Sequence, residues 1–178
     1  MSMITPRILA ATLASGLLIS HTTLADSVTV NISGNVVASP CIVDGSAITN
    51  VILDDIDISE LTTAGSSGTN KFFDLKLKEC PARTTKVTAT FSGIADKNNS
   101  NYFANSGTAD NVAIQIKDIP AAWASNVITP TGGKTMTVNV VATDHTAKFS
   151  LVTRIISPDG TAQPGTVNSA IQVSFTYQ

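Results

Sequence analysis

Apolar residues recur at every second position in segment after segment of this chain, and no stretch of helical length repeats them at intervals of three and four. Successive side chains of a β-strand point to opposite faces, so this alternation is typical of strands with one buried face. The segment Lys71 to Cys80 is a clear case, with Phe73, Leu75 and Leu77 on one face. The pattern predicts an all-β protein.

Seven or eight short strands are expected, separated by breaks rich in Gly, Pro, Asn and Ser. The predicted strands cover residues 27–37, 50–61, 71–80, 86–92, 111–117, 135–142, 147–156 and 167–178. Residues 93–110 and 118–134 are predicted connections, and Ser157-Pro158-Asp159-Gly160 is a predicted turn. Short strands at this spacing in one domain favour a β-sandwich with Greek-key connections.

The first 25 residues predict an export signal. Arg7 supplies a positive start, residues 8–19 form a twelve-residue apolar stretch, and Thr23-Leu24-Ala25 offers small residues for cleavage. The apolar stretch is too short to span a membrane. An uncleaved anchor is the alternative, but no longer apolar run or charge cluster follows. Cleavage after Ala25 leaves 153 residues, which suits one domain.

The charge balance excludes a nucleic-acid-binding surface. Removal of Arg7 with the signal leaves ten basic residues against 13 acidic ones, whereas nucleic-acid binding requires clustered Lys and Arg. Charged residues make up only 13% of the chain and hydrophobic residues 43%. For an exported protein, this composition predicts that a partner covers much of the surface.

Two cysteines, Cys41 and Cys80, remain after export. An oxidising compartment makes a disulfide the expected state of such a pair. On the chain-entropy model, closing a loop of about 40 residues destabilises the unfolded state by roughly 4 kcal/mol. The alternative, a reactive or metal-binding pair, lacks CxxC spacing and a nearby histidine.

The segment Asp26 to Ala38 has an unusual apolar face. The positions on that face are Val28, Val30, Ile32, Gly34 and Val36. Glycine on a buried strand face weakens the strand unless another group must approach closely there. The pattern alone leaves open an ordinary first strand with Gly34 at a bulge.

This segment resembles the donor strand of chaperone–usher pilus subunits, especially those of the type 1 fimbrial family. Residues 36–41 (VVASPC) resemble the family's approach to its first cysteine, and Glu79-Cys80-Pro81 resembles the surroundings of its second. Phe91-Ser92-Gly93 follows at the expected distance, and the chain ends in an alternating strand with a penultimate tyrosine, Tyr177. The resemblance covers the whole mature chain.

The resemblance implies an incomplete immunoglobulin-like sandwich that lacks its last strand. Residues 1–25 would be the signal peptide, 26–38 the donor-strand extension and 39–178 the pilin domain. The apolar face of the extension would enter a neighbour's groove. This chain's own acceptor groove would be bordered by Ile171, Val173, Phe175 and Tyr177.

The resemblance also implies partners and a location. A periplasmic chaperone would fill the groove first, and at the outer-membrane usher a neighbouring pilus subunit would replace it. The product would be an extracellular fimbrium. A two-domain adhesin would need a longer chain, and a terminator would lack a donor strand. Residues 107–112 look most like the minor tip subunits that join a tip adhesin to the shaft, with a major shaft pilin as the alternative.

Other classes of function have weaker support. His145 is the one histidine left after removal of the signal, and it lies between two predicted strands, so we expect an exposed turn residue rather than a catalytic one. Asp54, Asp55 and Asp57 lack EF-hand spacing and are expected at a solvated edge. Trp123 is expected to anchor a loop; a sugar-stacking role in a free-standing carbohydrate-binding module is the alternative. We expect no enzyme activity, metal or cofactor.

Overall fold

The computed structural model describes residues 28–36, 39–119, 122–123 and 127–178. The chain forms two units, Met1–Asn35 and Val36–Gln178. Within the described residues, helix is limited to a single 3-10 turn, Ile58–Leu61, and none is long and apolar enough to cross a membrane. The predicted signal peptide, residues 1–25, lies outside the described residues.

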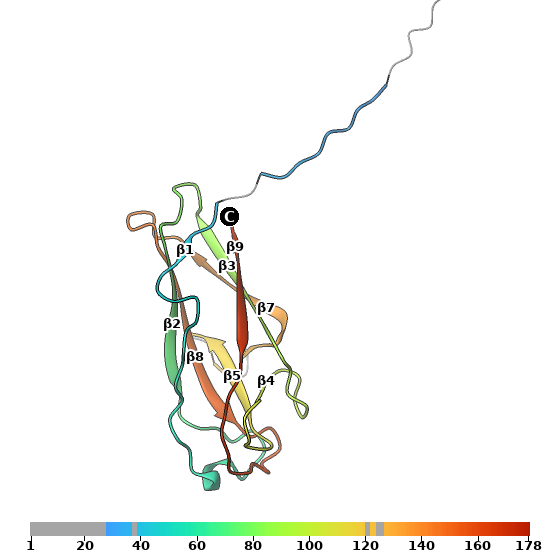
Figure 1. The fold of residues 1–178 in the computed structure, drawn as a ribbon, viewed down its shortest axis with the longest axis vertical. Helices are drawn as coiled ribbons and strands as arrows, with labels where there is room; N and C mark the ends of the chain where they lie inside the picture. Colours follow the sequence, from blue (N-terminus) through green and yellow to red (C-terminus); the bar gives the residue numbers. More distant parts are fainter. Residues whose placement is uncertain (1–27, 37–38, 120–121, 124–126) are drawn as a thin grey trace, which may run out of the picture. The chain divides into compact units, whose positions relative to one another are not determined.

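The second unit is built from two antiparallel sheets (Figure 1). The first sheet has the order β1-β2-β8-β5-β4, with β6 beside β5. Its strands are β1 (Ile42–Val43), β2 (Lys71–Lys78), β8 (Ala147–Ile156), β5 (Ala113–Asp118), β4 (Phe103–Ala104) and β6 (Val127–Ile128). The second sheet has the order β7-β3-β9, with β7 (Thr131–Asn139), β3 (Lys86–Gly93) and β9 (Ile171–Tyr177).

The core lies between the two sheets and is built from the alternating apolar positions. Phe91, Phe103, Phe149, Leu77 and Leu151 are all almost completely buried. Full burial of such a side chain contributes about 1.5–3 kcal/mol, so a few of them dominate the stability of a domain this small. The fold is the predicted all-β sandwich.

The long connections contain more structure than their composition predicts. The Asn-rich stretch 93–110 includes β4, whose Phe103 is fully buried. The predicted connection 118–134 contains β6 and the start of β7, which begins at Thr131, four residues before the predicted strand. Gly132 has a φ of +70° there. This pair of glycines therefore lies inside a strand, where their composition had indicated a break.

Two segments that the sequence predicts as strands form no strand in the described residues. Residues 28–36 of the first predicted strand belong to no strand, and residues 50–57 are irregular before the 3-10 turn begins. The first segment alternates in sequence and the second is a less regular extended run. A strand also requires a neighbouring backbone with which to exchange hydrogen bonds. The sequence pattern indicates which side chains share a face, but it does not indicate whether another backbone segment lies alongside to pair with theirs.

The disulfide prediction is confirmed. Cys41 and Cys80 are bonded, and both are buried. The bond joins the residue before β1 to the chain just after β2, where Ile42 pairs with Lys78. The His145 Nδ1 atom lies 2.8 Å from the carbonyl oxygen of Cys80, and the backbone N–H of Cys80 donates to the His145 carbonyl. His145 is an exposed residue of the turn between β7 and β8, as predicted.

Candidate functional site: an open groove beside the last strand

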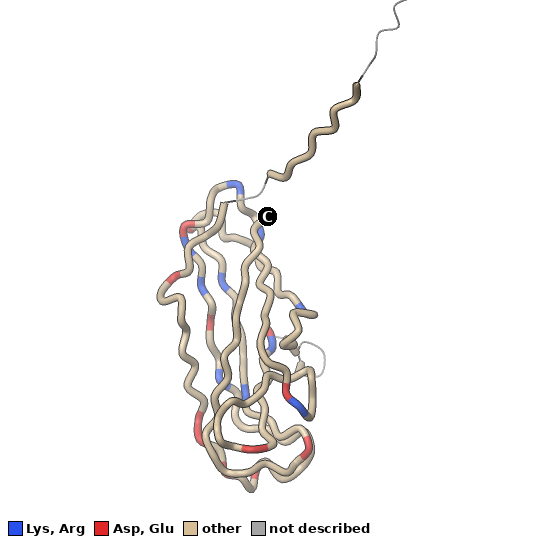
Figure 2. The backbone as a smooth tube through the Cα atoms, turned by 45° about the vertical axis from the view of Figure 1, so that its right-hand side comes forward, with Lys and Arg blue, Asp and Glu red and all other residues tan. Residues whose placement is uncertain are grey.

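The last strand, β9, forms an edge of the second sheet. It pairs with β3 from Val87↔Tyr177 to Gly93↔Ile171, and no strand of the described residues pairs with its other side. β9 carries no charged residue, and Figure 2 marks the charged positions on the other segments. A long uncharged edge with free N–H and C=O groups is a template for an added strand.

A groove of about 1850 Å³ lies between β9 and the segment that follows β1. In Figure 1 this segment descends at the left of the domain, and β9 runs down the middle. The groove is lined by side chains that would otherwise belong to a closed core. They include Phe73 and Leu75 of β2, Phe91 of β3, Ile114 and Ile116 of β5, and Ile171, Val173 and Phe175 of β9.

The opposite wall of the groove, residues 44–57, also has an unpaired backbone. Asp44 N–H donates to the Lys76 carbonyl, but no backbone–backbone hydrogen bond joins residues 46–56 to any other described segment. Val51, Ile52 and Leu53 all line the groove; Val51 and Leu53 are half-buried and Ile52 is exposed. An extended wall and the extended edge of β9 border the groove, and no strand of the described residues lies between them.

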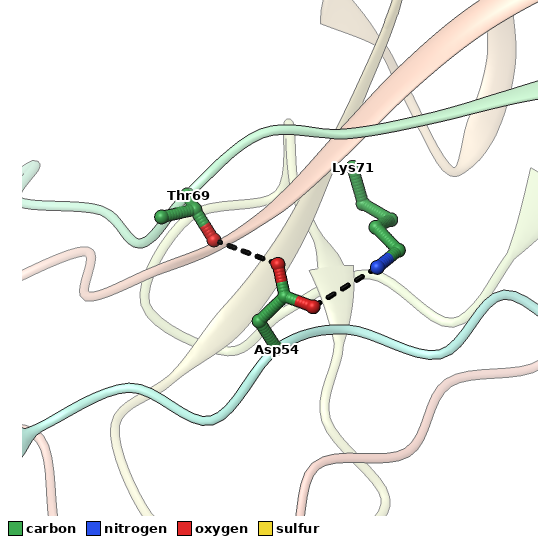
Figure 3. A network of polar contacts seen from close by, with 3 residues as sticks. All are labelled: Asp54, Thr69 and Lys71. Atoms are coloured by element: carbon green, nitrogen blue, oxygen red, sulfur yellow. Dashed lines mark hydrogen bonds and ion pairs between the residues drawn. The ribbon is translucent and has the colours of Figure 1, made fainter.

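Side chains hold this wall in place. Lys71 Nζ donates to Asp54 Oδ1 at 2.9 Å, and Thr69 Oγ1 donates to Asp54 Oδ2 at 3.4 Å (Figure 3). The hydrogen bond from Lys71 and its positive charge lower the pKa of Asp54. Asp57 accepts from the Ser59 backbone N–H at 2.8 Å and caps the 3-10 turn. These acids therefore position the wall, and the described residues contain no cluster of three or more potential metal ligands.

Two paired loops close one end of the groove. The amide of Asn105 bridges them: its Nδ2 donates to the carbonyl oxygens of Ala109 and Thr166, and its Oδ1 accepts from the Asn168 N–H at 2.8 Å. A Cβ atom at Gly107 would overlap the backbone of Thr166, so the loops can approach this closely only with glycine there. The richness of residues 93–110 in Asn, Ser and Gly predicts a surface loop, and this composition does not indicate which loop they pair with.

The predicted border residues of the groove divide into two groups. Ile171, Val173 and Phe175 line it, each half-buried. Tyr177 lies beyond the lining and packs against the core, where burial raises the pKa of its phenol.

The predicted donor residues are exposed in the isolated chain. Val28, Val30, Ile32 and Val36 have exposed fractions between 72% and 103%, and nothing lies within 4 Å of where a Cβ atom of Gly34 would be. Scattered apolar residues on a surface are ordinary, but four on one face of one short segment indicate a surface meant to be covered. Residues 26, 27, 37 and 38 of this segment lie outside the described residues.

The model of the fimbrial protein family matches residues 30–178. The chain belongs to this family. It is 36% identical over 170 residues to Protein FimG of Escherichia coli K12, which covers 96% of this chain and 95% of the relative. It is also 36% identical over 167 residues to the S-fimbrial adhesin protein SfaS of Escherichia coli, with coverage of 93% and 95%.

Solved structures show the same fold. The P pilus rod subunit PapA superposes with a TM-score of 0.61 at 15% identity, covering 79% of this chain and all of that one. Together with family membership, this establishes an incomplete immunoglobulin-like pilin fold and a structural subunit of an extracellular pilus that contacts other pilus subunits. The relatives are fimbrial structural proteins rather than enzymes.

Proposed function

We propose that the groove accepts an extended strand from a neighbouring pilus subunit, and that residues 26–38 of this chain supply such a strand to the next subunit. The observation that carries the proposal is the groove itself: core side chains lie open between two extended segments that both have unpaired backbone. An inserted strand would pair with β9 and fill the groove with alternate side chains. Residues 39–178 would then be the pilin domain.

Burial of the donor face supplies much of the binding free energy. Val28, Val30, Ile32 and Val36 would each contribute about 1.5–3 kcal/mol on leaving water for a neighbour's groove. The side-chain period of a strand is two, so a slip of one residue would turn the whole apolar face outward. The register of insertion is therefore strict, and Gly34 takes the position where a neighbour's groove is shallow.

The open groove also supports a role for a chaperone. An exposed apolar groove beside an unpaired strand is an aggregation hazard in a free subunit. A periplasmic chaperone that fills the groove until assembly removes this hazard. Exchange of the chaperone for the next subunit at an outer-membrane usher follows from the resemblance to chaperone–usher subunits.

We infer that the subunit links a tip adhesin to the pilus shaft. A linking subunit needs both a groove and a donor strand, and the resemblance of residues 107–112 to minor tip subunits supports this position. A major shaft subunit also needs both parts and is the second candidate. Immunogold labelling of intact pili distinguishes the two: label confined to pilus ends supports the linker, and label along the shaft contradicts it.

Substitution of Gly34 tests donor function. The Gly34→Leu variant places a large side chain on the donor face, so we expect it to fold with its chaperone but to enter fibres at a small fraction of the normal level. Asn35→Leu is the matched control, because position 35 lies on the opposite face of the same strand. Quantitative blotting of purified pili measures both. Normal incorporation of Gly34→Leu would contradict the proposal.

A further inference from the structure

A second hollow, here called the Arg154 hollow, lies on the outer face of the first sheet and has a volume of about 520 Å³. Gln115 of β5 and Arg154 of β8 are cross-strand partners on this face. Their chain neighbours Ile114, Ile116 and Ile155 line the strand-accepting groove instead. Because side chains of a strand alternate between faces, the hollow and the groove lie on opposite faces of the same two strands. Filling one leaves the other accessible.

Arg154 is a half-buried cation that forms no ion pair with a carboxylate of the described residues. Its Nε donates to Gln115 Oε1 at 2.8 Å, which fixes the plane of the guanidinium group. The three ion pairs found between described residues are Lys71–Asp54, Lys78–Asp44 and Lys148–Asp74, and none involves Arg154. Loss of solvation lowers the pKa of Arg154. A partly buried charge is costly unless it is paired, so this position favours an incoming anion.

The terminal nitrogens of Arg154 are available for that anion. The hydrogen bond to Gln115 is the one found for the Arg154 side chain among described residues, and it uses Nε. The two terminal nitrogens present the parallel N–H pairs that bind a carboxylate in bidentate fashion. No acidic residue lines the hollow among the described residues. The charge of the site is therefore positive.

The remaining walls of the Arg154 hollow combine an aromatic side chain with polar groups that could contact the ring of a hydroxylated ligand. The guanidinium carbon of Arg154 lies 4.0 Å from the centre of the Trp123 ring, and Lys117 Nζ lies 5.0 Å from it. Tyr102, Asn101 and Thr129 add hydroxyl and amide groups to the lining. An aromatic wall with several convergent polar groups is typical of small-molecule sites, whose volumes are about 300–1,000 Å³. A ring with many hydroxyl groups and one carboxylate matches this set of groups.

We propose that the Arg154 hollow binds an acidic sugar. The carboxylate lies against the terminal nitrogens of Arg154. The sugar ring lies along the edge of Trp123, because the stacked Arg154 guanidinium covers a face of that ring. Tyr102, Asn101 and Thr129 exchange hydrogen bonds with its hydroxyl groups. Because the groove is on the opposite face, a strand inserted into the groove does not occupy this site.

The fluorescence of Trp123 gives a direct test, because it is the one tryptophan in the sequence. The mature chain is titrated with methyl glucuronide, methyl glucoside and inorganic phosphate. We expect a saturable change with the glucuronide. We expect binding of the glucoside to be weaker by about tenfold or more, since it lacks the charge-assisted hydrogen bonds. Phosphate, which has charge without a ring, should also bind more weakly.

The Gln115→Glu variant supplies Arg154 with a carboxylate from the protein itself and is expected to reduce glucuronide binding by about tenfold or more. Gln172→Glu makes the same change on an exposed position of β9 and should leave binding unchanged. Thermal unfolding of both variants verifies the fold. Equal binding of glucuronide and glucoside, phosphate binding as tight as glucuronide binding, no fluorescence response, or full binding by Gln115→Glu would each overturn the proposal. None of these results depends on whether the groove accepts a strand.

Discussion

Phe175 shows how one side chain of β9 belongs to both the core and the groove. Its ring centre lies 5.6 Å from that of Phe149, which is fully buried in the first sheet. The same side chain lines the groove and is only half-buried in the chain on its own. An inserted strand would complete its burial, so its contribution to stability depends on whether the groove is filled.

The Phe175→Ala substitution is therefore expected to destabilise the strand-filled subunit by about 3–5 kcal/mol, as for a buried phenylalanine. The open subunit should lose less free energy of unfolding, since about half of the Phe175 side chain is already exposed to water there. Denaturant unfolding with and without bound donor peptide measures both values. Thr176→Ala, on the exposed face of β9, is the control. Equal losses in the two states would show that no strand covers Phe175.

The role of a single side chain is predictable from the sequence where it follows from that residue's own strand. Phe73, Leu75 and Leu77 share a face as predicted, because alternation alone decides it. Gln115 and Lys117 are cases in which the alternation of a strand does not predict burial. They occupy the polar positions of β5, yet both are buried, because Arg154 and Trp123 lie over that face. Trp123 lies far along the chain from Arg154, and no local pattern reports such a contact.

At the scale of elements, the wall formed by residues 44–57 is the least secured part of the groove. The rest of the sandwich is joined by ladders of backbone hydrogen bonds, whereas most of this wall is held by side chains alone. These are exposed pairs such as Lys71–Asp54 and the packing of Leu53 and Ile56 on a small buried cluster. Exposed ion pairs contribute little stability. The wall is therefore expected to yield easily when a strand enters or leaves.

The wall should loosen in acid. Lys71 lowers the pKa of Asp54 below its ordinary value of 3.8. A lowered carboxyl pKa stabilises the folded wall fully above 3.8, and this contribution is lost as the pH falls through the lower folded value. Cleavage within residues 50–57 by pepsin, a protease that is active in acid, should accelerate over that range relative to Asp54→Asn, which has already lost the charge. Asp55→Asn should behave as the unmodified chain. Identical pH profiles for all three would contradict the role of Asp54.

Element boundaries were predictable where the strands have continuous partners. β2, β3 and β8 lie within two residues of their predicted ranges because their alternation and their ladders coincide. The start of β7 was missed because Gly132-Gly133 indicates a turn by composition but continues the strand in the structure. Residues 50–57, a less regular extended run in the sequence, form no strand because no neighbouring backbone pairs with them. A β-strand therefore requires both a suitable local sequence pattern and a neighbouring strand with which to pair.

At the scale of the whole molecule, the chain combines an unfilled groove with an exposed apolar segment. Joining the segment of one subunit to the groove of the next is a head-to-tail contact, and such contacts form open fibres when the rotation between subunits does not close a ring. The apolar segment was predictable from the alternation of residues 28–36. The groove was expected only from the resemblance to pilus subunits, because the period of a strand does not show which sheet edge is left open.

The most direct test of this account is the stability of the domain with and without a supplied strand. Residues 39–178, refolded with the Cys41–Cys80 disulfide formed, are unfolded thermally alone and with a peptide of residues 26–38. We expect the midpoint to rise by about 10 °C or more with the peptide, and to rise little with a peptide that carries Gly34→Leu. An unchanged midpoint with no peptide bound would show that the sandwich is complete by itself and would contradict the account.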